Sequence, residues 1–194
     1  VSQAGVKDAF WRAWQKAYEG QRESGLEIGP LGQVQELLKI LDINLDEPLF
    51  AKFYRAFTDT LLDYPPPLND HVAETLPVLS KRFKLAVICN TGITPGKGLR
   101  KLMAEDDILK YFTVLTFSDE LGVAKPKKTI FNHTLNLLKS PSNEAAHIGD
   151  DATTDIWGAK NAGMTTIWLA PHVEYAVVEA DFHIRSVKAL LTLF

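Results

Sequence analysis

The sequence lacks the features that mark secreted and membrane proteins. Its 194 residues include one cysteine, Cys89, so no internal disulfide can form. No run approaches the roughly 18 consecutive apolar residues that a membrane-spanning helix needs. The first residues also lack the charged start and apolar stretch of a signal peptide. We therefore expect a cytoplasmic protein with no membrane partner.

The sequence also has no excess of positive charge. It contains 21 basic and 24 acidic residues, the formal net charge is −3, and the two signs are mixed along the chain. Nucleic-acid-binding domains usually carry a basic face, so we expect no nucleic-acid partner. Hydrophobic residues make up 46% of the chain, and its length allows one domain with a sizeable core and a small attachment.

The first third of the chain predicts helices. Apolar residues recur at helical spacing over 7–23, from residue 29 to 41 and from residue 46 to 61. Proline or acidic residues near the second and third starts are typical of helix N-termini. The run of prolines at 65–67 cannot continue a helix and marks a linker. We therefore assign residues 1–66 to a separate helical unit.

The remaining residues, 67–194, predict an α/β domain. After a helix over 69–82 come four short apolar runs and a weaker fifth, at 85–90, 113–117, 145–149, 165–169 and 181–184. Short buried strands that alternate with helices are typical of a Rossmann-like parallel sheet covered on both faces. Ligands bind such sheets beyond the C-terminal ends of the strands, so the residues after each run are the candidates for function.

Three aspartates gather after the third run. Asp150 and Asp151 follow Gly149 directly, and Asp155 comes four residues later. Carboxylates are the ligands that Mg²⁺ prefers, whereas a single aspartate before a helix usually caps it through backbone N–H groups. Three aspartates exceed what capping needs, and we therefore favour a metal site over a cap.

Two further stretches suggest an anion site. Asn90, Thr91 and Gly92 follow the first run, where small polar residues can surround an anion with N–H groups, although a plain turn fits equally well. Lys125 precedes Pro126, which restricts its backbone and could direct its ammonium at a phosphate. The alternative for an isolated lysine is a solvated surface position, which we expect for Lys127 and Lys128.

The order of these signals resembles the haloacid dehalogenase-like (HAD) hydrolase superfamily over nearly the whole chain. The resemblance implies that residues 1–66 form an α-helical cap on a HAD-like core at 67–194. It implies that Lys125 binds phosphate and that Asp150 and Asp155 hold Mg²⁺, with Asp151 as their neighbour. In that family the positions of Lys125, Asp150 and Asp155 take part in catalysis on a small phosphorylated substrate.

The resemblance is weaker at the family's second motif, a Ser or Thr followed by Asn. Asn90 fits this motif, but the residue before it is Cys89, which has no hydroxyl group. Either the hydroxyl of Thr91 or backbone N–H groups, including that of Gly92, would then contact phosphate.

The family's nucleophilic motif is absent from the sequence. In the family, the first aspartate of Asp-x-Asp-x-Thr attacks phosphorus and the second protonates the leaving alcohol. The nearest match, Asp59 to Asp63, has the wrong spacing and continues a helical stripe. The motif ends a central strand between those that end at Asn90 and Gly149, and its loss would leave unpaired backbone groups.

We therefore expect that the sequence, which begins at Val1 and not at methionine, is truncated at its N-terminus. The intact protein would be a Mg²⁺-dependent phosphatase that forms an aspartyl-phosphate. One alternative is a 2-haloacid dehalogenase, which needs no Mg²⁺ and gives no reason for a retained carboxylate pair. The other alternative is a catalytically inactive HAD-like binding module.

The missing nucleophile predicts that the 194-residue chain does not hydrolyse a generic phosphate ester. Release of p-nitrophenol from p-nitrophenyl phosphate, followed with and without Mg²⁺, measures this. Mg²⁺-dependent release above the rate of a heat-denatured sample would mean that the nucleophile lies elsewhere in the chain.

Overall fold

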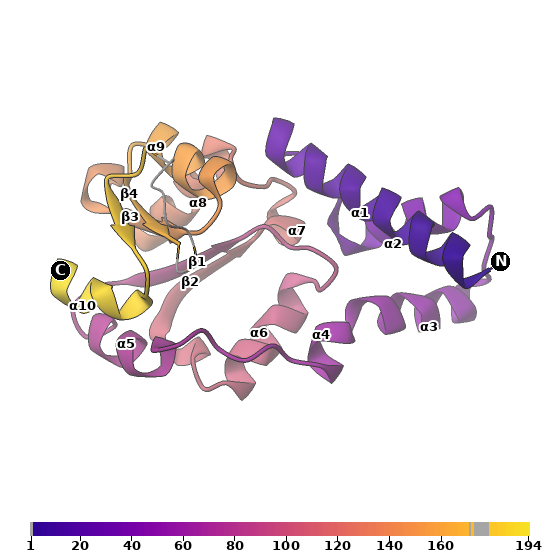
Figure 1. The fold of residues 1–194 in the computed structure, drawn as a ribbon, viewed down its shortest axis with the longest axis horizontal. Helices are drawn as coiled ribbons and strands as arrows, with labels where there is room; N and C mark the ends of the chain where they lie inside the picture. The colour runs from indigo at the N-terminus through magenta and orange to yellow at the C-terminus, as the bar shows by residue number, and fades with distance from the viewer. Residues whose placement is uncertain (1, 171, 173–178) are drawn as a thin grey trace.

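The N-terminal part of the protein is a layer of helices beside the sheets (Figure 1). In this computed structural model, residues 2–170, 172 and 179–194 are described. The layer comprises α1 (Gln3–Ser24), α2 (Gly29–Ile40), α3 (Glu47–Thr58) and α4 (Thr60–Asp63). Helix α1 begins earlier than the apolar spacing predicts because Ser2 caps it, accepting a hydrogen bond from Gly5 N at 3.1 Å.

A small apolar core holds the helical layer together. Its fully buried members are Ala9, Ala13, Val34, Leu37 and Leu38. Alanines therefore form the buried face of α1, and small side chains let α1 approach α2 closely. Trp11, which the helical spacing assigns to the same stripe, is 51% exposed. None of the described helices combines the length and the apolar character that crossing a membrane would require.

The strands of the core are all parallel, as the alternation of strands and helices predicts. They are β1 (Leu85–Cys89), β2 (Phe112–Phe117), β3 (Ala146–Gly149), β4 (Thr165–Leu169) and β5 (Phe182–Ile184). Strand β1 pairs with β2, and β4 lies between β3 and β5. The sheet is therefore in two parts, with two strands in one and three in the other.

Helices cover both faces of these sheets (Figure 1). On one side lie α8 (Lys128–Leu138) and α9 (Gly158–Asn161), which contribute Ile130, Phe131 and Ala159 to a shared buried cluster. On the other side lie α5 (Val72–Leu79) and α10 (Leu190–Leu193). Helix α5 begins later than the helix predicted over 69–82 because His71, directly before it, has a φ of +69°, outside the right-handed helical region, and it ends at Leu79. The remaining helices, α6 (Gly96–Glu105) and α7 (Ser118–Leu121), follow β1 and β2.

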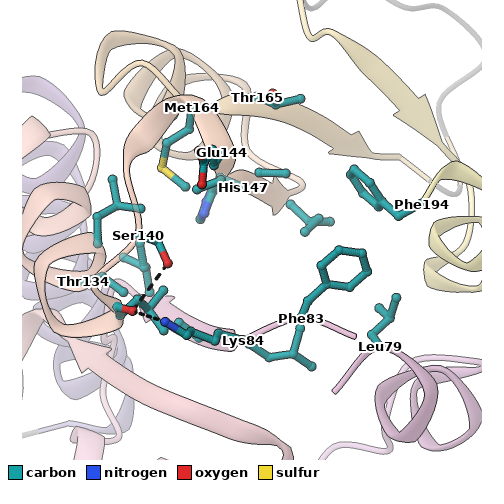
Figure 2. Close-up of a pocket in the computed structure, with 18 of the residues that line it drawn as sticks. Leu79, Phe83, Lys84, Thr134, Ser140, Glu144, His147, Met164, Thr165 and Phe194 are labelled. Carbon is teal, nitrogen blue, oxygen red and sulfur yellow. Dashed lines mark hydrogen bonds between the residues drawn. The ribbon is translucent and has the colours of Figure 1, made fainter. Parts of the chain in front are cut away.

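The two parts of the sheet are separated by a cavity of about 560 Å³ (Figure 2). Among the described residues, β1 pairs only with β2 and β3 only with β4, so the facing edges of β1 and β3 have no strand partner. We call this cavity the inter-sheet slot. Residues of both strands line it together with those of the flanking helices: Leu79, Phe83, Ala86, Ile88, Leu135, Ala146, His147, Ile148, Met164 and Phe194.

Phe131 is the central side chain of the cluster under α8, and it is fully buried. We predict that Phe131→Ala lowers the free energy of unfolding by about 3–5 kcal/mol, because the truncation leaves a cavity. Leu137→Ala, on the same helix but at a position that is 54% exposed, is the matched control and should stay within about 0.5 kcal/mol of the parent. Urea unfolding followed by circular dichroism measures both, and similar losses would contradict this picture of the core.

Candidate functional site

The loops after β1 and β3 and the segment that carries Lys125 meet at one edge of the core. Asn90 joins two of them, because its Nδ2 donates to the carbonyl of Lys125 at 2.8 Å and its Oδ1 accepts from Lys125 N at 2.7 Å. Both ends of the amide are therefore used to hold the lysine backbone. Asn90 positions Lys125 through these bonds, and its role as a phosphate ligand stays a prediction.

Lys125 and Asp155 form a buried ion pair. The ammonium Nζ donates to Asp155 Oδ1 at 2.5 Å, and the two side chains are 11% and 7% exposed. Asp155 lies in a π-helical segment, Ala152–Trp157, and its Oδ2 accepts a hydrogen bond from Asp151 N at 3.1 Å. The predicted lysine and the predicted acid are therefore in contact.

His147 is a third member of this cluster. Its Nε2 lies 2.9 Å from Asp155 Oδ1, and its ring packs edge-on against Phe131. Burial lowers the pKa of His147. Burial would raise the pKa of Asp155, but the hydrogen bond with His147 and the charge of Lys125 outweigh it and hold that pKa well below its usual value. The imidazole is then neutral and donates to an ionised carboxylate.

Our sequence reasoning missed His147. The available signal was a histidine inside a short buried strand, where a polar side chain needs a hydrogen-bond partner. The contact with Asp155 also explains why residue 149 is a glycine. A Cβ at this position would lie 2.2 Å from Asp155 Cγ, so only glycine lets the carboxylate pack against the end of β3.

The other two aspartates have different surroundings. Asp151 caps the π-helical segment, since its Oδ1 accepts from Thr153 N at 2.9 Å and Thr154 N at 2.8 Å, while its Oδ2 pairs with Arg22 of α1. Burial would raise the pKa of Asp151, but these bonds hold it below its usual value. The capping alternative therefore applies to this residue.

Asp150 is exposed, and its carboxylate has no hydrogen bond or ion pair with any residue that the structure describes. Its backbone carbonyl accepts a hydrogen bond from Trp168 Nε1 at 3.0 Å, which fixes the chain at this point. Within the described ranges, no three acidic, histidine or cysteine side chains gather into a group that could hold a metal ion. Metal binding by Asp150, Asp155 and Asp151 stays a prediction.

The loop after β1 is tied to the core through Thr91. Its backbone N–H donates to Ser118 Oγ at 2.7 Å, and its hydroxyl lies 3.1 Å from the same oxygen. The Thr91 hydroxyl thus already has a partner, and because the residue is 1% exposed, it is not open to solvent. Burial raises the pKa of the Cys89 thiol, which favours its neutral form. At Gly92 the space beside the backbone is open, with no atom within 4 Å of an added Cβ.

The helical layer covers this loop. A cavity of about 220 Å³ lies between the two, and we call it the interlayer cleft. Its lining from the helical layer is Trp14, Ala17, Tyr18, Gln21, Arg22 and Gln33, and its lining from the core is Asn90, Thr91, Gly92, Asp151 and Thr154. Predicted phosphate and metal residues thus face helices α1 and α2. No motif marks the lining residues of the helical layer, so local patterns do not predict which of them face the loop.

The sequence is similar to a protein family and to several named proteins. The family described as "Haloacid dehalogenase-like hydrolase" matches residues 27–169. Pyrimidine 5'-nucleotidase YjjG of Escherichia coli is 33% identical over 123 residues, which is 63% of this chain and 53% of that protein. Glyceraldehyde 3-phosphate phosphatase of Pyrococcus furiosus is 30% identical over 146 residues, or 75% of this chain and 59% of that protein. The chain thus spans little more than half the length of these two curated relatives.

The fold has solved neighbours as well. The structure of the HAD-hydrolase YfnB of Bacillus subtilis, bound to magnesium, matches with a TM-score of 0.72 at 21% identity. The match covers 100% of this chain and 83% of that one. This likeness supports the α/β architecture with a neighbouring helical layer.

The buried pair of Lys125 and Asp155 generates a stability prediction. Asp155→Asn should lower the free energy of unfolding by about 3–5 kcal/mol, because it leaves the buried ammonium without a counter-charge. Asp150→Asn is the matched control and should change it by no more than about 0.5 kcal/mol, since that carboxylate is exposed. Urea titration at pH 7 compares them, and equal midpoints for the two variants would show that the pair does not stabilise the fold.

Proposed function

The chain belongs to the haloacid dehalogenase-like hydrolase family, and we propose that it carries the phosphate- and metal-binding part of a phosphatase for a small phosphorylated metabolite. The observation that carries the proposal is the buried Lys125, held by Asn90 and Asp155, at the same edge of the core as Asp150, whose carboxylate has no partner among the described residues. Two relatives named for activity on phosphorylated compounds support the choice of substrate class.

Lys125 is suited to bind a phosphoryl group. An ammonium has three N–H donors, and in the described structure Lys125 Nζ uses one of them, for Asp155. The other two remain for phosphate oxygens. Asp155 fixes the ammonium in place, and Asn90 fixes the backbone that carries it, so the charge is held before a substrate arrives.

The three aspartates of this segment are not equally available to bind Mg²⁺. This ion takes oxygen ligands and is usually held by one or two carboxylates, with water and phosphate at the other positions. Asp150, whose carboxylate has no partner among the described residues, would hold the ion directly, whereas the oxygens of Asp155 already accept three hydrogen bonds. We propose Asp155 and Asp151 as the surrounding acids. When bound, Mg²⁺ would neutralise charge on the transferring phosphoryl group.

The inter-sheet slot offers a place for the missing nucleophile. Among the described residues, the facing edges of β1 and β3 have no strand partner, and they lie on either side of a cavity lined by apolar and polar side chains, where an extended parallel segment could pair with both edges. Such a segment would end at the same edge of the core as Asn90 and Gly149. We propose that, in the complete protein, it carries the aspartate whose carboxylate attacks phosphorus while the ester oxygen leaves, before water hydrolyses the acyl phosphate.

The helical layer would select the substrate. Arg22 and Gln21 reach from α1 to the loops of the site, so the layer closes over bound phosphate and excludes water. The interlayer cleft, at about 220 Å³, is smaller than the roughly 300–1,000 Å³ of sites for drug-sized ligands. Its size therefore favours a compact substrate.

We predict that fusing an apolar strand that ends in Asp-x-Asp to the N-terminus of the chain produces a phosphatase. Its hydrolysis of p-nitrophenyl phosphate should require Mg²⁺, stop with EDTA, and fall at least about 100-fold with Asp150→Asn, because the metal loses its direct ligand. The matched control carries Asn-x-Asn in the same strand, and should show the same gain in melting temperature without activity.

Two outcomes would contradict this proposal. An unchanged rate in the fused Asp150→Asn protein would remove the metal assignment. Release of halide from 2-chloropropionate that is insensitive to EDTA would instead favour the dehalogenase alternative.

A further inference from the structure

Two glutamines of the helical layer bind consecutive carbonyls of the loop after β1. Gln21 Nε2 of α1 donates to the carbonyl of Thr91 at 3.0 Å, and Gln33 Nε2 of α2 donates to the carbonyl of Gly92, also at 3.0 Å. The two glutamines are 9% and 1% exposed. Two different helices therefore hold two successive peptide groups of one loop.

These bonds fix where the next N–H groups point. In a trans peptide the C=O and the following N–H point in opposite directions. Since the carbonyls of Thr91 and Gly92 face the glutamines, the N–H groups of Gly92 and Ile93 face away from them. Neither N–H has a hydrogen-bond partner in the described part of the chain, although Thr91 N just before them has one. Successive unpaired N–H groups are suited to bind an anion.

The orientation of the Gln33 amide is energetically unfavourable for its oxygen. Its Oε1 is buried and has no hydrogen-bond partner among the described residues. An unsatisfied buried amide oxygen is unfavourable, and natural proteins contain few of them. Gln15, on the exposed side of α1, shows the ordinary situation, since its amide reaches only Glu19 on the same helix. The position of Gln33 is explained if its N–H is needed at Gly92.

We infer that Gln21 and Gln33 are positioning residues that turn the N–H groups of Gly92 and Ile93 toward a phosphate oxygen. The inference rests on the proposed function, because it takes this loop as the place where phosphate binds. It assigns the contact at the second motif to backbone donors and makes their orientation depend on the helical layer. When both glutamines of the helical layer bond to the loop, the loop has the shape that binds the anion.

Nuclear magnetic resonance tests the inference on the 194-residue chain with inorganic phosphate as the probe. We expect saturable shifts of the Gly92 and Ile93 amide signals in the parent. Gln33→Met and Gln21→Met, which keep side-chain length but lose the donor, should bind phosphate at least tenfold more weakly and show faster backbone motion at 91–93. Gln15→Met is the matched control and should behave like the parent.

The outcomes separate this inference from the proposed function. If phosphate binds, is lost with Lys125→Met, and is unaffected by the two glutamine variants, the positioning role is overturned while the proposed function stands. If the parent does not bind phosphate, the proposed function fails, and NMR relaxation of the backbone at 91–93 still tests whether the glutamines hold the loop. Unchanged backbone motion in both glutamine variants would overturn the positioning role, and increased motion confined to those variants would support it.

Discussion

The buried pair of Lys125 and Asp155 is the interaction around which the candidate site is built. An ammonium can remain charged in a buried position only if a counter-charge and hydrogen bonds offset its lost hydration. Asp155 supplies the charge, and His147 and a backbone N–H complete the surroundings of the carboxylate. The close packing at Gly149 and the double hydrogen bond of Asn90 both serve to keep these two charges together.

The three clustered aspartates show how one sequence feature separates into different roles. Their spacing predicts one metal site, which stays a prediction, and each carboxylate meets different partners in the described structure. Asp155 turns inward to the lysine, Asp151 caps a helical segment and reaches Arg22, and Asp150 faces solvent. Successive side chains of an extended chain point to opposite sides, so neighbouring acids at the end of a strand can meet different partners.

Much of the fold could be predicted from sequence because it depends on local patterns. Apolar runs located the strands to within about a residue, and Asp46 and Pro48 marked the start of α3. Positions that depend on tertiary contacts could not be predicted in this way. The burial of Gln33 against Gly92 arises from elements that are distant in the chain, and the exposure of Trp11 depends on how α1 packs. The contact between His147 and Asp155 spans only eight residues, but it depends on how the chain turns after β3. Nothing in a local pattern shows which distant backbone group a glutamine will reach.

The open edges of β1 and β3 have a consequence for how this polypeptide would behave in a crowded solution. In the described part of the chain, two strand edges without a strand partner face one cavity, and such edges are templates for pairing with another extended chain. Molecules of the isolated polypeptide would thus be prone to sticking to one another and to unfolded neighbours. A segment paired with both edges would protect solubility, whatever else it contributed.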